Sequence, residues 1–150
     1  MSSQEEKIEY LRLRPKKLTV LNFKKYGYII QWQGPEKKGY HNQFRIVIRD
    51  RKVVGWRIAY LIVRAKQINS LEKHPFSYES FEPINGRGIL YVCAQKTPQA
   101  IEAFLLDKPI ILRKGIWHNV AACTREMHIK ITENNKVKLI KHKLRQAIKP

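Results

Sequence analysis

Apolar and polar residues alternate with a period of two along many short stretches of the chain, as they do in half-buried β-strands. In Trp56–Arg64 this alternation places Trp56, Ile58, Tyr60 and Ile62 on one face. We expect the last two of the predicted strands to pair as a hairpin across Asn134 and Asn135. The predicted strands are Tyr28–Trp32, Phe44–Arg49, Trp56–Arg64, Tyr78–Phe81, Gly88–Ala94, Ile110–Leu112, Val120–Cys123, Met127–Thr132 and Val137–Lys141.

Two segments instead have the spacing and the end signals of helices. Leu18–Tyr26 begins beside Thr19, which can cap a helix, and ends before Gly27, which can adopt the left-handed conformation that stops one. Thr97–Leu106 opens with a capping threonine and a proline at the first helical position, and its apolar residues recur at helical spacing. We expect this second helix to pack outside the strands.

Many short strands at regular intervals predict an all-β barrel or sandwich. A chain of 150 residues suits one domain and can bury a proper core, so we expect a single domain over residues 1–150. The segment Glu82–Arg87 would be a loop between two strands. The basic segment Lys141–Pro150 would form a tail that is helical or frayed.

The charge balance narrows the choice of partners. Lysine and arginine total 30 against 12 acidic residues, which gives a formal net charge of +18. This favours a small anionic substrate, or weak, salt-sensitive and sequence-independent binding to polyanions. No stretch resembles a membrane span or an apolar signal core, so we expect a soluble, cytoplasmic protein without membrane contact. Cys93 and Cys123 are too few for a disulfide framework and would be reduced core thiols.

Two histidines beside predicted strands are the first candidates for chemistry. His74 lies two residues after Glu72 and five before Glu79, and a glycine follows seven residues later. This spacing resembles the first motif of small cupin barrels, with Glu72 where that motif has a histidine. Gly115 and His118 match the end of the second cupin motif, although its proline and asparagine are absent here.

A longer resemblance covers most of the chain and points to the ureidoglycolate lyases, which have a cupin-type barrel. The chain departs from that family at Lys73 and Lys114, where we would expect arginine, at Glu79 in place of glutamine, and at Asn119 in place of histidine. The residues that carry the resemblance are Leu18, Thr19, Phe23, Tyr26, Gly27, Ile30, the run Glu72–Pro75, Phe81, Pro83, Gly86, Arg87, the stretches Leu90–Ala94 and Ile101–Leu105, and the run Lys114–His118.

The resemblance implies a fold and a reaction. The fold would be a small cupin-like β-barrel or jelly roll with one or two short peripheral helices. The reaction would release urea and glyoxylate from ureidoglycolate, or act on a related small carboxylate, as a carbon–nitrogen lyase of the amidine type. Such a reaction belongs to allantoin degradation and purine metabolism.

The reaction needs a base for the substrate hydroxyl and an acid for the departing urea nitrogen. His118 can exchange protons near neutrality, with Glu79 and His74 as its candidate partners. Each candidate also has a plain structural interpretation, as a packed or a solvated side chain. The residues that the resemblance places around the substrate are Lys114, Arg87 and Lys73, which would contact its carboxylate, and Trp117, which would form an apolar wall.

A metal site competes for the same residues. Glu72, His74, Glu79 and His118 offer two imidazoles and two carboxylates, a set suited to Mn, Fe, Ni or Zn. A metal would polarise the substrate hydroxyl. The alternatives are acid–base chemistry without metal, or Glu72 as a surface acid and His74 as a packed side chain. We expect no organic cofactor.

Two functions without catalysis stay open: a cupin-fold protein that only binds a ligand, and a nucleic-acid-binding protein. A small barrel of this kind is also expected to form a homodimer through edge strands. The nucleic-acid interpretation depends on aromatic residues interleaved with lysines, namely Tyr26, Tyr28, Trp32 and Tyr40 with Lys24, Lys25, Lys37 and Lys38.

Overall fold

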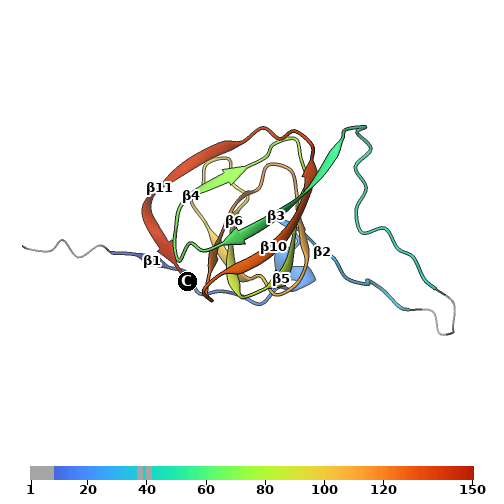
Figure 1. The fold of residues 1–150 in the computed structure, drawn as a ribbon, viewed down its shortest axis with the longest axis horizontal. Helices are drawn as coiled ribbons and strands as arrows, with labels where there is room; N and C mark the ends of the chain where they lie inside the picture. The colour runs from blue at the N-terminus through green and yellow to red at the C-terminus, as the bar shows by residue number, and fades with distance from the viewer. Residues whose placement is uncertain (1–8, 37–38, 40–41) are drawn as a thin grey trace, which may run out of the picture.

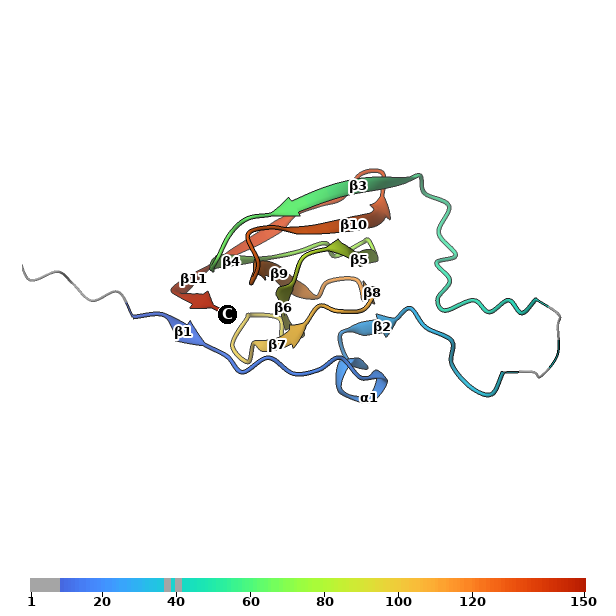
Figure 2. The same cartoon turned by 60° about the horizontal axis from the view of Figure 1, so that its bottom comes forward.

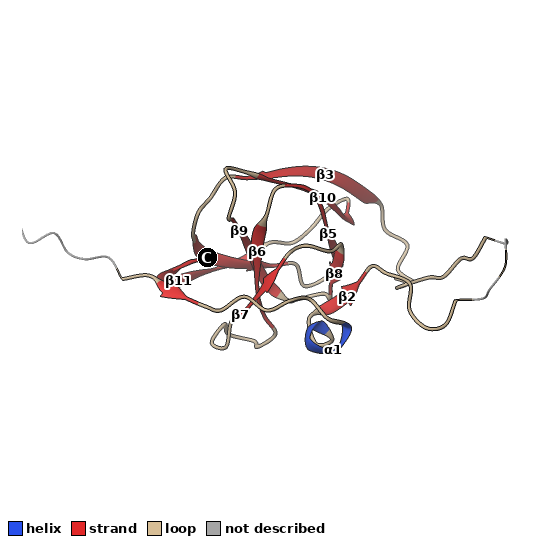
Figure 3. Ribbon diagram, turned by 90° about the horizontal axis from the view of Figure 1, so that it is seen from below, coloured by secondary structure: helices blue, strands red, loops and turns tan. Residues whose placement is uncertain are grey.

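The structure is a computed structural model that describes residues 9–36, 39 and 42–150. Within these residues the chain forms eleven strands and one short helix, α1 (Val20–Phe23), which Figure 3 shows beside the strands. No described helix is long and apolar enough to cross a membrane. The strands are β1 (Leu11–Arg12), β2 (Gly27–Ile29), β3 (Trp56–Val63), β4 (Ile68–Lys73), β5 (Glu79–Asn85), β6 (Gly88–Cys93), β7 (Glu102–Leu105), β8 (Ile110–Leu112), β9 (Trp117–Ala122), β10 (Met127–Asn134) and β11 (Ile140–Lys149).

The strands form two sheets that curl around a common interior, as Figures 1 and 2 show. The six-stranded sheet has the order β1-β11-β4-β9-β6-β7, and the five-stranded sheet has the order β2-β8-β5-β10-β3. Successive residues of a strand point to opposite faces, so each strand sends every second side chain into the interior. The all-β class predicted from the alternation is confirmed.

Two cores stabilise the arrangement. The main core fills the space between the sheets, with Leu90 and Val120 from one sheet facing Phe81 and Ile129 from the other. A second core lies on the opposite face of the six-stranded sheet. Cys93 belongs to this second core, whereas Cys123 is exposed, so the prediction of two core thiols is wrong for Cys123.

The first predicted helix is present but shorter than expected. Thr19 caps α1, and its side chain accepts a hydrogen bond from the backbone N–H of Asn22. The helix ends at Phe23, and Gly27 does not stop it in a left-handed conformation, because Gly27 already belongs to β2. The glycine serves close packing instead: a Cβ atom there would lie 1.8 Å from the carbonyl oxygen of Ile111.

The second predicted helix, Thr97–Leu106, does not form. Residues 97–101 are irregular, and Glu102–Leu105 form β7, which pairs with β6. The pairing buries Ala103 and Phe104, whose exposed fractions are 2% and 0%. Contacts with β6 therefore override a local pattern that suits a helix.

The predictions for the C-terminal third need two corrections. β10 and β11 belong to different sheets, so they do not form the predicted hairpin. The basic segment Lys141–Pro150 is neither helical nor frayed, because residues up to Lys149 belong to β11, which pairs with β4. In the middle of the chain, the predicted loop Glu82–Arg87 is shorter than expected, because β5 continues to Asn85 and the turn is made at Gly86, with φ of 80°.

The connection from β2 to β3 extends away from the two sheets (Figure 2). The strand predicted at Phe44–Arg49 is not formed, and the Phe44 side chain is 90% exposed. β3 itself is confirmed, and its four apolar residues share a face as predicted. That face is exposed, however, because it is Ala59, Leu61 and Val63 that contact the main core.

Candidate active site

Five ionisable side chains meet in the interior between the two sheets. Four are at most 8% exposed, and the fifth, Glu72, is partly exposed. They are Glu72 on β4, His74 directly after β4, Glu79 at the start of β5, His118 on β9 and Glu133 on β10.

Strand alternation explains why these polar side chains point inward. On β10 the buried positions Met127, Ile129 and Ile131 are followed at the same spacing by Glu133. Glu72 and His118 are direct register partners on neighbouring strands, so their side chains lie on the same face of the six-stranded sheet.

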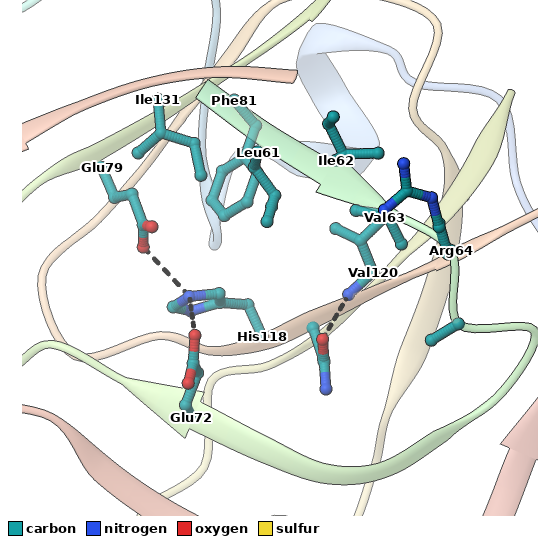
Figure 4. A pocket seen from close by; sticks show the side chains of 12 residues that line it. Leu61, Ile62, Val63, Arg64, Glu72, Glu79, Phe81, His118, Val120 and Ile131 are labelled. Atoms are coloured by element: carbon teal, nitrogen blue, oxygen red, sulfur yellow. Dashed lines mark hydrogen bonds and ion pairs between the residues drawn. The ribbon is translucent and has the colours of Figure 1, made fainter. Parts of the chain in front are cut away.

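Glu79 bridges the two histidines. Its Oε2 atom lies 3.0 Å from Nε2 of His118 and 3.3 Å from Nε2 of His74. Glu72 Oε1 is 4.0 Å from Nε2 of His118, and Glu133 Oε2 is 3.9 Å from Nε2 of His74. Figure 4 shows Glu79 and Glu72 approaching His118 from different sides. The structure thus brings together Glu72, His74, Glu79 and His118, as their spacing in the sequence suggested.

The backbone orients both imidazole rings. Nδ1 of His118 donates to the carbonyl oxygen of Ile116 at 2.9 Å, and Nδ1 of His74 donates to that of Lys138 at 3.2 Å. Because Nδ1 of each ring carries a hydrogen for this bond, Nε2 of each ring is the atom that faces Glu79 in the interior. Nε2 of His118 and Oε2 of Glu79 lie 3.0 Å apart, but both are buried polar atoms without a hydrogen-bond partner in the structure. These two atoms are therefore available to exchange a proton or to bind a ligand in the interior.

The cluster carries an excess of negative charge. Arg57 donates to Oε1 of Glu133 at 2.7 and 3.0 Å and so compensates one carboxylate. The three carboxylates of Glu72, Glu79 and Glu133 against this one guanidinium leave two negative charges. Two protonated imidazoles, or one divalent cation, would neutralise them.

The surroundings of His118 favour its protonated form. Burial lowers the pKa of His118, but the Glu79 carboxylate, the Ile116 carbonyl and the Glu72 carboxylate together raise it above its usual value of 6.5. The raised pKa increases the fraction of His118 that is protonated at a given pH, and the imidazolium can serve as a proton donor.

A cavity of about 390 Å³ opens beside this cluster. Glu72, Glu79 and His118 form its polar wall, and Leu61, Phe81, Val120 and Ile131 are among its apolar lining residues (Figure 4). Phe81 also packs edge-on against the His118 ring, with 5.5 Å between the ring centroids. The volume suits a small metabolite.

The structure does not bring the predicted substrate-contacting residues to this cavity. Trp117 points to the second core, on the opposite face of β9 from His118, and the Lys73 ammonium lies over its ring. Lys114 pairs with Asp50 at 2.9 Å. Arg87 lies in the turn between β5 and β6, beside Thr124. None of the four is among the residues that line the cavity.

Sequence reasoning missed Glu133, Arg57 and Arg64. Glu133 could have been found, because it continues the apolar alternation that begins at Met127. Arg57, its partner, lies opposite it on β3 and becomes visible only with the strand register. Arg64 lines the cavity because β3 ends there, and no local pattern indicates this.

Two sets of side chains have the geometry of metal ligands. Glu72, His74 and His118 form one set, and His74, Glu79 and Glu133 form the other, with the ligand atoms of each set within 4.8 Å of one another. Together with the excess negative charge and the unsatisfied atoms, this donor set fits a divalent ion.

Two of the aromatic residues predicted to stack nucleic-acid bases, Tyr26 and Tyr28, are not free to do so. Tyr26 is 1% exposed, and the Tyr28 ring is covered by the Arg113 guanidinium. Lys37, Lys38 and Tyr40 lie outside the described residues. Weak polyanion binding stays a prediction from the net charge.

Comparison with known proteins gives the family. The family model described as ureidoglycolate lyase matches residues 10–142. The chain belongs to the ureidoglycolate lyase family. A ureidoglycolate lyase from Rhizobium etli (strain CIAT 652) is 26% identical over 127 residues, which cover 74% of this chain and 75% of that protein. The resemblance drawn from the residues is confirmed, and the two curled sheets form the cupin-like barrel that it implies.

Solved structures that match this chain include an oxalate decarboxylase from Bacillus subtilis, with a TM-score of 0.44 and 15% identity. That match covers 61% of this chain but only 24% of the decarboxylase. A dTDP sugar isomerase from Desulfovibrio desulfuricans G20 has a TM-score of 0.44 and 12% identity, over 83% of this chain and 82% of the isomerase.

Proposed function

We propose that this protein is a carbon–nitrogen lyase that releases urea and glyoxylate from ureidoglycolate or a closely related small carboxylate. The observation that carries the proposal is the pair of buried histidines bridged by Glu79, of which His118, with Glu79, lines the cavity. Elimination of urea needs an acid and a base a few ångströms apart, and this cluster supplies both. Membership of the family supports the same reaction.

The proton transfers follow from the positions of Glu72 and His118. Glu72 takes the proton of the substrate hydroxyl as the aldehyde of glyoxylate forms. The carbon–nitrogen bond breaks, its electron pair stays on the nitrogen, and the His118 imidazolium protonates that nitrogen. After urea and glyoxylate leave, the proton on Glu72 returns to His118, whose Nε2 lies 4.0 Å from Glu72 Oε1.

Glu79 and His74 complete the site. Glu79 keeps His118 protonated through its contact at 3.0 Å. His74 contacts the same carboxylate oxygen from the other side and holds it in place. Both residues are buried, so solvent does not weaken these contacts.

In a metal-bound form, which excludes the proton on His118, side chains of the same cluster would hold a divalent ion such as Mn, Fe, Ni or Zn. Either of two sets would supply the ligands: Glu72, His74 and His118, or His74, Glu79 and Glu133. When bound, such an ion would polarise the substrate hydroxyl and lower its pKa. Titration of the purified protein with Mn²⁺ or Zn²⁺ in a calorimeter tests this, and His74→Ala should abolish the binding.

The test of the proposed reaction is the release of glyoxylate by purified protein, with and without added divalent ions. His118→Ala should lower kcat by about 100- to 10,000-fold, the usual loss for a positioned acid or base. His142→Ala is the matched control, because His142 contacts Trp117 and not the cavity. Equal rates for the two variants would reject the role of His118.

We also propose that the protein acts as a homodimer through the outer face of β3. This face and residues 42–54 expose the apolar side chains of Phe44, Ile46, Val53, Val54, Trp56, Ile58, Tyr60 and Ile62, each at least 39% exposed. A stable interface takes about 800 Å² from each partner, and eight large side chains offer roughly that area. β3 is also an edge of the five-stranded sheet, so a second copy can pair with it around a two-fold axis.

A further inference from the structure

A row of side chains crosses three neighbouring strands of the six-stranded sheet on the face toward the cavity. Glu72 on β4 is the register partner of His118 on β9 and of Lys141 on β11. Directly opposed residues of paired strands lie on the same face, so Lys141 follows Glu72 on the cavity side. Neighbouring strands are about 4.8 Å apart, which places the Lys141 backbone roughly 10 Å from that of His118.

The Lys141 ammonium is available for an anion. Glu72, its opposite neighbour, directs its carboxylate toward His118 instead of pairing with the lysine. Lys143 lies two residues further on the same face, opposite Ser70, and both lysines are exposed. Within the described part of the chain, neither lysine has a carboxylate within ion-pair distance, whereas Lys16, Lys25, Lys114 and Lys130 each have one.

The cavity needs such a cation. Its wall carries the carboxylates of Glu72 and Glu79, which would repel an anionic substrate. Arg64 is the one arginine or lysine among the described residues that line the cavity, and its guanidinium already pairs with Glu126 at 3.0 Å. A cation at the open side would offset the repulsion.

We propose that Lys141, with Lys143 beside it, binds the carboxylate of the substrate at the open side of the cavity. The four-carbon stem of lysine lets the ammonium reach from β11 toward Glu72 and follow the ligand. The inference rests on the proposed function, because it names the group that recognises the anionic part of that substrate. It also gives part of the large positive charge a definite role.

The kinetic test compares Lys141→Gln with Lys96→Gln, which removes an equal charge from an exposed lysine beside Trp117, on the other face of the sheet from His118. Lys141→Gln should raise KM for ureidoglycolate about tenfold. It should leave kcat within about twofold, because the carboxylate is charged in ground and transition states alike. Lys141→Arg should restore most of the loss, and added salt should shrink the difference. Lys96→Gln should change neither constant.

An equilibrium measurement separates this inference from the proposed reaction. Glyoxylate serves as the anionic probe and urea as the neutral one, each titrated calorimetrically into the protein at low salt. Glyoxylate should bind the wild type and the Lys96→Gln variant equally, and Lys141→Gln about tenfold more weakly. Glyoxylate binding without any turnover would reject the reaction and keep the inference. Equal weakening in both variants, or no glyoxylate binding to the wild type, would overturn the inference.

Discussion

At the scale of the residue, His118 is placed under two opposing influences. Burial favours the neutral imidazole, whereas the carboxylates of Glu79 and Glu72 favour the imidazolium and prevail. The result is a buried acid whose pKa lies above its usual value, although the side chain is only 3% exposed.

This balance predicts how His118 titrates. Its pKa should lie above 6.5 in the metal-free protein, and Glu79→Gln should lower it, because burial then acts with less opposition. A raised pKa stabilises the fold below about pH 6.5, and this contribution is lost as the pH rises through the folded-state pKa. NMR titration of the His118 ring checks the shift. Glu82→Gln, which removes a carboxylate paired with Lys130, should leave it unchanged. A lower pKa in the wild type than in Glu79→Gln would contradict the prediction.

The sequence predicts site residues correctly only where they lie close together along the chain. His74 and Glu79 flank the turn into β5, so their interval of five residues is a local property. The resemblance predicted that Lys114 and Arg87 lie in the site. The structure places them elsewhere, because their positions depend on the course of whole strands. Lys141 lies on the same face of the sheet as Glu72 because β11 pairs with β4, and no residues near Lys141 in the sequence indicate this register.

At the scale of the element, β2 is held against β8 by a glycine. No side chain fits at Gly27, because its Cβ would collide with the backbone of Ile111. Gly27→Ala should therefore lower the free energy of unfolding by about 1–3 kcal/mol through overpacking. Urea unfolding curves measure this, and Gly55→Ala is the control, because its Cβ would meet only the Asn135 side chain at 3.3 Å. Equal midpoints for the two variants would refute the role of Gly27.

The elements themselves were predictable where alternation is long. β10 was found because apolar and polar residues alternate over Met127–Thr132, and β3 because large apolar residues recur at every second position from Trp56 to Ile62. Thr97–Leu106 was misjudged because apolar residues three and four apart suit a helix as well as a strand buried on both faces. The pairing of Phe104 with Leu90 decides between them, and this contact is distant in the sequence.

At the scale of the whole molecule, the exposed apolar face of β3 predicts a dimer. Trp56 and Ile58 are 69% and 55% exposed. Trp56→Glu with Ile58→Glu should convert a dimer to a monomer, because charges at the centre of an interface are costly to bury. Light scattering after gel filtration measures the mass. Leu21→Glu on α1, where the side chain is 83% exposed, should leave the dimer intact. A wild-type mass equal to one chain would contradict the prediction.

The central claim is that the cluster around His118 cleaves the bond between carbon and the urea nitrogen. The most direct measurement follows ¹³C-labelled ureidoglycolate by NMR with the wild type and with His118→Gln. The account predicts urea and glyoxylate in equal amounts from the wild type. The variant should form them at a rate reduced by about 100-fold or more. Carbon dioxide and ammonia in place of urea, or no turnover by the wild type with or without divalent ions, would contradict it.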